Sequence, residues 1–218
     1  MTLTIEIIAD IVCPWCFIGK RRLETAIALV RRDHPDFTCR TRWLPFFLNP
    51  DTPPEGEPYL PFLERKFGGR APVEALFARV REAGQAYGLD YAFEKISLRA
   101  NTLGAHRLIH WAQQQGDADA LVERLFVAQF QRGEYVGDIA LLVEIAAACG
   151  YDGEAVASYL RSTDDEALVR TQERQLRAMG INQVPTFIVA GNRVVVGAED
   201  PSVLANCIGE CLVQAGEN

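Results

Sequence analysis

Two cysteines near the start of the chain constrain its fold more than any other feature. Two residues separate Cys13 from Cys16, and the pair stands where an apolar run ends and a helical pattern begins. If Cys13 begins that helix, Cys16 lies about one turn further on, and the two sulfur atoms can close a small disulfide ring. Pro14 favours this geometry, because proline is preferred at the first helical position. With Trp15, these residues form a Cys-Pro-Trp-Cys motif that we interpret as a redox-active dithiol.

A helix that begins at Cys13 makes the two thiols unequal. The positive end of the helix dipole and the unpaired backbone N–H groups lower the pKa of a thiol at this position. Cys13 is therefore predicted to be the nucleophile, and Cys16, one turn inside, to be the resolving cysteine. Trp15 adds an apolar ring without charge, so we expect the helix start to be the main cause of the acidity of Cys13.

Composition limits the classes of protein to consider. The chain has 218 residues, of which 49% are hydrophobic, and a formal net charge of -7. This content is ample for a packed domain with an insertion, and the acidic balance argues against binding to nucleic acid or anionic membranes. The basic group from Lys20 to Arg22 is predicted to lie on a solvated helix face. Without a membrane-spanning run or a signal-peptide pattern, a cytoplasmic protein is expected.

The other four cysteines do not share the redox spacing. Cys39 and Cys149 fall in apolar patterns typical of small buried hydrophobic residues. Cys207 and Cys211 are four residues apart on a predicted helix, on the same stripe as Leu204. Their burial as apolar residues is favoured, and a second redox pair or a metal role for them stays open.

The pattern at the start of the chain predicts a β-α-β unit. Residues 3–9 and 37–44 alternate as strands do, and residues 14–30 show a helical period. A right-handed crossover places the two strands parallel and the cysteines at the carboxyl end of the first strand. Chemistry in open α/β sheets is found at that end.

The rest of the chain predicts helices first and a hairpin later. The proline-rich segment 49–58 interrupts the pattern. Helices are predicted over residues 59–67, 72–87, 102–115, 117–131, 138–149, 154–160 and 164–179, the last with a capping box at Thr163–Glu166. Strands at 184–189 and 193–196 with a two-residue turn at Gly191-Asn192 predict a hairpin, and Asp200 caps a final helix.

This order of elements predicts an α/β protein, a thioredoxin-like fold with a large all-helical insertion domain. The first half of the thioredoxin-like domain covers residues 1–48 and the second half covers 180–218. The insertion covers residues 49–179. Its last helix belongs either to the insertion or to the thioredoxin-like domain.

Four segments resemble the DsbA-like branch of the thioredoxin superfamily, and within it the FrnE-type oxidoreductases. They are Asp10–Glu24 with the Cys-Pro-Trp-Cys motif, Trp43–Pro50, Ala105–Leu108 and Val184–Phe187. The resemblance extends over nearly the whole chain. It implies a thioredoxin fold whose two halves are separated by a helical domain.

The resemblance also implies roles for individual residues. Pro185 matches the cis-proline that faces the cysteine pair in this superfamily. The segment of Val184, Pro185 and Thr186 would then lie beside Cys13, and the Val184 backbone would pair with a bound thiol substrate as an added strand. His106 falls in the family-like Ala105–Leu108 segment and is expected near the groove between the domains.

A Cys-x-x-Cys motif also suits half of a zinc site, which needs two further ligands. Two pairs at helical spacing are candidates, Cys207 with Cys211 and His106 with His110. The cysteines fit an apolar stripe, and no third ligand is evident beside the histidines. We therefore predict no metal site.

Together these features predict a thiol-disulfide oxidoreductase, of the protein disulfide oxidoreductase or isomerase kind, that requires no metal or organic cofactor. The substrates are thiols or disulfides of proteins or small molecules. Glutathione is a candidate thiol partner, with Val184 for its cysteinyl part and the region of Asp200 for its charged part. The physiological substrate, the direction of electron flow and the choice between monomer and homodimer stay open.

Two other functions remain as alternatives. Kappa-class glutathione transferases and 2-hydroxychromene-2-carboxylate isomerases look similar in architecture, but they usually lack paired cysteines and use a serine to activate glutathione. A non-enzymatic, chaperone-like protein would bind apolar segments in the groove beside the helical insertion.

Overall fold

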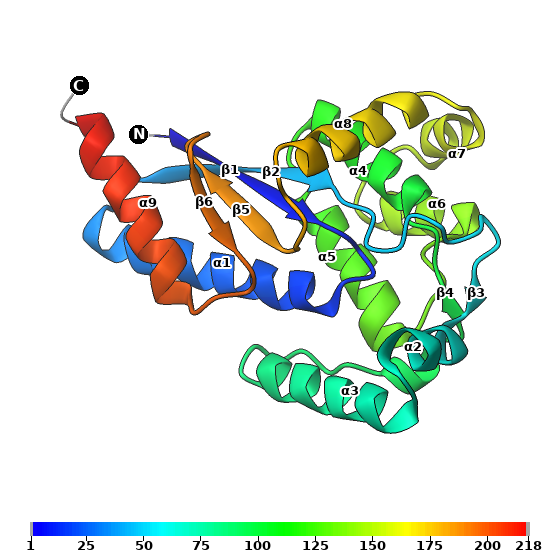
Figure 1. Cartoon of the computed structure of the whole chain (residues 1–218). Coiled ribbons are helices and arrows are strands. Elements are labelled where there is room, and N and C mark those ends of the chain that lie inside the picture. The colour runs from blue at the N-terminus through cyan, green and yellow to red at the C-terminus, as the bar shows by residue number, and fades with distance from the viewer. Residues whose placement is uncertain (1, 217–218) are drawn as a thin grey trace.

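The computed structural model describes residues 2–216 and contains a four-stranded sheet with helices on both faces (Figure 1). The predicted β-α-β unit is confirmed as β1 (Thr2–Ala9), α1 (Pro14–Asp33) and β2 (Thr38–Pro45). β1 and β2 pair in parallel, with Ile7 opposite Trp43. The crossover therefore places the cysteine motif at the carboxyl end of β1.

Two antiparallel strands complete the sheet. β5 (Thr186–Val189) pairs with β1, and β6 (Arg193–Val196) pairs with β5, which gives the order β2-β1-β5-β6. The predicted hairpin is confirmed, but its turn also includes Ala190. Ala190 and Gly191 have φ values of 52° and 76°, and two successive positive φ angles give a turn whose twist suits a hairpin.

The segment between the two halves of the sheet is helical. It contains α2 (Tyr59–Phe67), α3 (Arg70–Gln85), α4 (Leu103–Gln115), α5 (Asp119–Val127), α6 (Ile139–Ala148), α7 (Gly153–Arg161) and α8 (Glu166–Ala178), with a short ribbon of β3 (Glu57–Pro58) and β4 (Leu98–Arg99) and a 3-10 turn at Phe93–Lys95. The last helix of the chain is α9 (Pro201–Gly216).

Two sequence predictions in the helical segment are wrong in detail. The helix predicted over 117–131 ends as α5 at Val127 and continues as a π-helical segment, η2 (Ala128–Arg132). The predicted capping box at the start of α8 does not form. The N-cap residue is Asp165, at a φ of 58°, and its carboxylate accepts a hydrogen bond from the Tyr159 hydroxyl instead of capping the helix.

The two faces of the sheet have separate cores. Ile7 belongs to the main core with Leu23 of α1 and Leu204 of α9. Ile8 points to the opposite face, where it packs with Leu176 of α8. α8 contacts both β2 of the sheet and α4 of the insertion, so it lies between the two parts.

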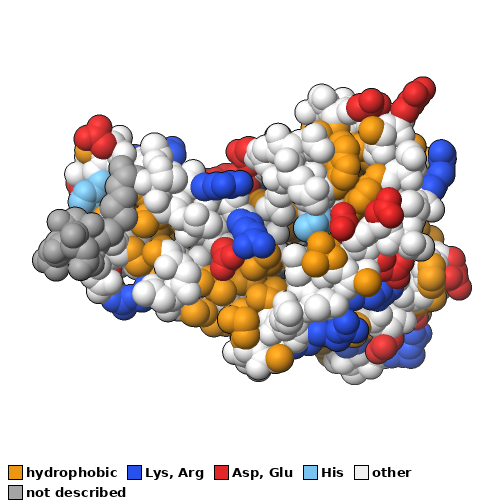
Figure 2. All heavy atoms as spheres, turned by 90° about the horizontal axis from the view of Figure 1, so that it is seen from above, with side chains coloured by type: hydrophobic (Ala, Val, Ile, Leu, Met, Phe, Trp, Pro, Cys, Tyr) orange, Lys and Arg blue, Asp and Glu red, His pale blue; other side chains and the backbone are white. Residues whose placement is uncertain are grey.

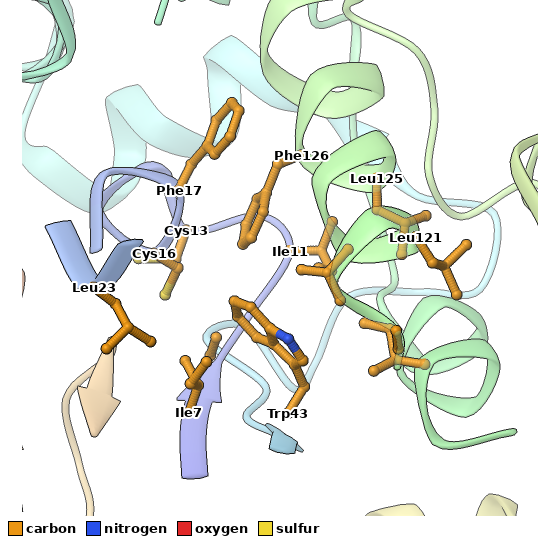
Figure 3. Packing of buried hydrophobic residues seen from close by; sticks show 14 of the residues in the cluster. Ile7, Ile11, Cys13, Cys16, Phe17, Leu23, Trp43, Leu121, Leu125 and Phe126 are labelled. Atoms are coloured by element: carbon orange, nitrogen blue, oxygen red, sulfur yellow. The ribbon is translucent and has the colours of Figure 1, made fainter. Parts of the chain in front are cut away.

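The main core continues from the sheet into the insertion. Phe17 of α1 stacks on Phe126 of α5, with ring centroids 5.1 Å apart, and Trp43 meets Phe126 edge-on at 6.3 Å. Figure 3 shows these rings beside the cysteine pair. The insertion is therefore packed directly against the helix that carries the cysteines. This packing restricts movement of the insertion relative to α1.

On the face drawn in Figure 2, acidic and basic side chains are interspersed, with hydrophobic side chains between them. Within residues 2–216, no helix is long and apolar enough to cross a membrane.

Candidate functional site

The cysteine motif forms the start of α1, as its spacing predicts. Cys13 is the N-cap residue, with extended backbone angles, and Pro14 is the first residue of the helix. The Cys13 N–H donates to the Asp10 carbonyl and the Cys16 N–H donates to the Cys13 carbonyl, each at 3.0 Å. These bonds fix a tight turn from β1 into the helix, and they hold both cysteines in the first turn.

The two thiols occupy different environments. Both are free, Cys13 is 5% exposed and Cys16 is 1% exposed. Burial raises the pKa of Cys16 well above its ordinary value, and the neighbouring Cys13 thiol raises it further. Cys16 therefore stays protonated near neutral pH. Cys16, predicted to be the more shielded of the two, is the more deeply buried.

The loop before β5 lies against Cys13. The Cys13 thiol donates to the Val184 carbonyl at 3.8 Å, across 171 residues of sequence. The peptide bond between Val184 and Pro185 is cis, the form that the resemblance implies. Thr186 is buried within β5 and its hydroxyl donates to the Gln183 carbonyl at 2.7 Å. Thr186 thus holds the loop in place while the Val184 carbonyl meets the Cys13 thiol.

Gly19 permits this close approach of helix and loop. A Cβ atom at position 19 would lie 2.7 Å from Cγ of Pro185 and 3.2 Å from the ring of Phe187. Carbon atoms in contact lie about 3.5–4.0 Å apart. A glycine six residues after Cys13 is therefore a steric requirement of the site.

A buried acid and a histidine lie behind the motif. Asp10 is 1% exposed and accepts a hydrogen bond from the Leu48 N–H at 2.7 Å. His106 of α4 is buried, and its Nε2 lies 3.3 Å from the Asp10 carboxylate. His106, expected near the groove between the domains, is thus buried against Asp10, a partner that the sequence did not single out. The signal for Asp10 was an acidic residue directly after a strand and three before Cys13.

The insertion also supplies Tyr91, which the sequence did not single out. Its hydroxyl donates to the Pro14 carbonyl at 2.7 Å. Its ring meets Phe17 edge-on, with centroids 6.3 Å apart. Burial is the first cause that raises the pKa of Tyr91, and the charges of Cys13 and Cys16 add to it. Tyr91 therefore ties the turn of the cysteine motif to the insertion.

Trp15 and Asp200, two further residues predicted for the site, have partners of their own. Trp15 is half-buried, with the Arg79 guanidinium 5.8 Å from its ring. Asp200 caps α9, accepting from the Ser202 N–H at 2.9 Å. Ala198, just before it, accepts a hydrogen bond from Arg22, which lies about 13 Å along α1 from Cys13 at the helical rise. Asp200 is thus placed beside the middle of α1 rather than beside Cys13.

The basic group on α1 is not the solvated face that the sequence predicted. Lys20 is 5% exposed and pairs with Glu24 and with Glu123 of α5, the latter at 3.2 Å. Arg21 pairs with the same two carboxylates. Lys20 and Arg21 therefore bind α1 to the insertion through Glu123, whereas Arg22 donates to the Ala198 carbonyl.

The remaining candidate ligands do not form a metal site in the described part of the chain. Within residues 2–216, no group of three or more His, Cys, Asp or Glu side chains is placed to hold a metal ion. His110 lies 3.8 Å from Asp165. Cys211 is buried and Cys207 is partly exposed beside it, and burial raises the pKa of Cys207.

With the site described, the chain can be compared with known proteins. Residues 4–209 match the family described as the DSBA-like thioredoxin domain. The chain belongs to this family. The DsbA-like fold, with a helical segment inserted into a thioredoxin-like sheet, is the one the sequence predicted.

Similar proteins span nearly the full length of this DsbA-like chain. The protein YwbO of Bacillus subtilis (strain 168), described as uncharacterized, is 27% identical over 211 residues, covering 96% of this chain and 98% of its own. The crystal structure of the probable DsbA oxidoreductase SCO1869 from Streptomyces coelicolor has a TM-score of 0.86 and 29% identity, covering 95% of this chain and 89% of that one.

Two more distant structures share the fold. A 2-hydroxychromene-2-carboxylate isomerase has a TM-score of 0.70 and 15% identity, and the cytosolic disulfide reductase DsbM from Pseudomonas aeruginosa with GSH has a TM-score of 0.63 and 15% identity. Each covers 98% of this chain and 98% of its own. At this identity the likeness concerns the fold alone, so the choice between these chemistries rests on the residues of the site.

Proposed function

We propose that this DsbA-like protein is a thiol-disulfide oxidoreductase in which Cys13 is the nucleophile and Cys16 is the resolving cysteine. One observation carries the proposal: Cys13 caps α1 beside the Val184 carbonyl, while Cys16 lies one turn deeper with a raised pKa. Such an arrangement leaves Cys13 as the less buried thiol, at the start of the helix, and keeps Cys16 protonated until it is needed.

In the reducing direction, the Cys13 thiolate attacks one sulfur of a substrate disulfide. The new bond joins Cys13 to that sulfur, and the other substrate sulfur leaves as a thiolate. Cys16 then loses its proton and attacks the sulfur of Cys13, which releases the second substrate thiol and leaves a Cys13–Cys16 disulfide. Two electrons pass from the enzyme to the substrate. The oxidising direction runs through the same mixed disulfide in reverse.

We propose glutathione as a thiol that returns the pair to its reduced state, because DsbM, which shares the fold, is described with GSH. The Asp200 carboxylate accepts hydrogen bonds from Ser202 at the start of α9, so the proposed glutathione contact is with the Val184 backbone and not with Asp200. No metal or organic cofactor enters the proposed exchange. The FrnE subtype is consistent with the family, and the cytoplasmic location and the oligomeric state stay predictions.

The test uses two single variants and turnover of a small disulfide substrate. We expect Cys13→Ser to abolish turnover and Cys16→Ser to accumulate a mixed disulfide that a reductant releases. Full activity of Cys13→Ser would refute the assignment. Glutathione-dependent isomerase activity that survives in a double variant of both cysteines would favour the isomerase chemistry, and suppression of aggregation without any redox activity would favour the chaperone-like alternative.

A further inference from the structure

The sheet ends at β6, and no other strand of residues 2–216 pairs with the outer edge of β6. The strand order is β2-β1-β5-β6, so β6 is the outermost strand beside β5 (Figure 1). An unpaired edge presents a row of backbone N–H and C=O groups to which another chain can add. β6 is therefore a candidate interaction surface, separate from the cysteine motif.

The hydrogen bonds of the hairpin show which backbone groups of β6 point outward. The Gly197 N–H donates to the Pro185 carbonyl at 2.7 Å. Hydrogen-bonded and non-hydrogen-bonded pairs alternate along an antiparallel ladder. With the register of β5 and β6, Val195 therefore bonds to β5, whereas the N–H and C=O groups of Val194 and Val196 point away from the sheet.

β6 lacks the features that usually keep an edge strand from associating. Protected edges carry lysine, proline, a bulge or an inward-pointing charge. In β6, three valines follow Arg193, and the side chains of Val194 and Val196 are 56% and 45% exposed. The opposite edge of the sheet is covered, because the Gln113 side chain of α4 bonds to both the N–H and the carbonyl of Trp43 in β2.

Exposed apolar side chains continue from β6 onto the segment that precedes β5. Met179 is 72% exposed, and it lines a recess of about 510 Å³ together with Ile181, Val194 and Val196. Single exposed apolar residues are ordinary, but a contiguous group is typical of a protein interaction site. The open edge and the apolar group therefore form one surface.

The charges at the two ends of β6 indicate what this surface binds. Arg193 is the only charged residue of segment 189–198, and Glu199 and Asp200 follow that segment. The Arg193 side chain is still 41% exposed although Glu210 lies 3.3 Å from it. An edge with a positive start and a negative end is complementary to an antiparallel copy of itself, whereas a parallel copy would bring like charges together. The occupant that fits is a second copy of this chain.

We propose that two copies of the protein associate through β6, about a two-fold axis at Val195. Antiparallel pairing then sets Val194 of each copy opposite Val196 of the other. Both members of each pair direct their N–H and C=O groups outward, so each pair exchanges two backbone hydrogen bonds. The two four-stranded sheets become one continuous sheet, and the four valine side chains meet on one of its faces.

The ends of the paired segment fit this arrangement. Arg193 falls opposite Gly197 of the second copy, a residue without a side chain, and Glu199 of that copy follows two residues later. The contact is short, so we expect it to belong to the small, reversible class of interfaces, below about 1,200 Å². The dimer should therefore form and dissociate within an accessible range of protein concentration.

Sedimentation equilibrium across about 5–500 μM protein tests the association. We expect the wild type to pass from monomer to dimer over this range. Val194→Lys and Val196→Glu should each weaken association at least about tenfold, because a charge is brought into the apolar contact. An equimolar mixture of the two variants should associate again, since the inferred register sets position 194 of one copy opposite position 196 of the other.

Leu168→Lys is the matched control for the charged variants. Leu168 is an exposed leucine of α8 that does not line the recess beside Met179, and Leu168→Lys is expected to associate like the wild type. Circular dichroism establishes that each variant is folded.

Amide hydrogen exchange of the wild type gives a measurement that needs no variant. The N–H groups of Val194 and Val196 should exchange at least about tenfold more slowly at the highest protein concentration than at the lowest, because only the dimer occupies them. The N–H of Val195 bonds to β5 in either state, so its exchange should not change with concentration.

Each contrary result overturns the proposal. A wild type that stays monomeric up to about 500 μM does not pair through β6. A dimer that Val194→Lys leaves intact, or in which the exchange of the Val194 and Val196 N–H groups is independent of concentration, uses another surface. A mixture of Val194→Lys and Val196→Glu that fails to associate excludes the register, and protection that appears only when an extended peptide is added to monomer assigns the edge to a different partner. These results do not depend on thiol-disulfide turnover, so they test the dimer separately from the proposed function.

Discussion

Gly19 provides the sharpest test of how α1 is positioned against the loop that faces the cysteines. In a Gly19→Ala variant, the new Cβ atom would lie 2.7 Å from Cγ of Pro185. Since carbon contacts settle at about 3.5–4.0 Å, the helix and the loop must separate by nearly 1 Å. Forced repacking of this kind costs about 1–3 kcal/mol.

The same substitution also stabilises the helix, and this effect must be measured separately from the steric overlap with Pro185. Replacing a glycine inside a helix by alanine stabilises the helix by about 1 kcal/mol. Gly209→Ala in α9 isolates this effect, because a Cβ atom at Gly209 would meet nothing within 4 Å. We expect Gly209→Ala to raise Tm by about 2–4 °C. Gly19→Ala is expected to melt lower than Gly209→Ala by about 4–8 °C, for an overlap cost of about 2 kcal/mol.

Activity provides the second measurement on the same pair. Cys13 and Gly19 lie on one rigid helix, so moving the helix from Val184 displaces the Cys13 thiol. Because a misplacement of about 1 Å can reduce a rate about a hundredfold, we expect Gly19→Ala to lower kcat/KM for disulfide reduction at least about tenfold. Gly209→Ala is expected to match the wild type. If Gly19→Ala gains as much in Tm as Gly209→Ala and keeps full activity, the steric reasoning is wrong.

Two further predictions concern the surroundings of the motif. Tyr91→Phe removes the hydroxyl that donates to the Pro14 carbonyl at 2.7 Å, and we expect it to lower the free energy of unfolding in urea by about 1 kcal/mol. Tyr151→Phe, which removes an exposed bond of 3.3 Å, is the control, and an equal loss in both variants would contradict a special role for Tyr91. Burial raises the pKa of Cys16, so the folded protein keeps a proton that the unfolded chain loses. The free energy of unfolding of the reduced protein should therefore fall as pH rises above about 8.5–9, more steeply than in Cys16→Ala by up to about 1.4 kcal/mol per pH unit. Identical slopes in urea titrations between pH 7 and pH 10 would show that burial of this thiol is not coupled to stability.

Much of the fold follows from local patterns of the sequence. Alternating apolar residues predict β1 and β2, and the helical period after Pro14 predicts α1. The position of Cys13 at the helix start follows from the same local signals, because capping and proline preference depend on neighbours within one turn. The hairpin near the end of the chain was predicted in the same way, but its first strand begins at Thr186 rather than at residue 184 and its turn is one residue longer.

Errors appear where a distant side chain competes with a local preference. Lys20 belongs to a charged triplet that favours solvent by itself, but Glu123 lies on α5 and draws it into a buried ion pair. Asp165 stands at the N-cap of its own helix, but its carboxylate accepts a hydrogen bond from the Tyr159 hydroxyl and does not cap the helix. The local sequence pattern identifies neither Glu123 nor Tyr159 as a partner.

The sequence by itself determined that two cysteines stand in the first turn of a helix that follows a strand, which is enough to predict a dithiol of a thioredoxin-like fold. Only the tertiary structure decided what surrounds them: Val184 at Cys13, His106 at Asp10 and Tyr91 at Pro14. The physical reason is that spacing along a chain fixes which side chains share a face, whereas the packing of distant elements decides which face each one meets.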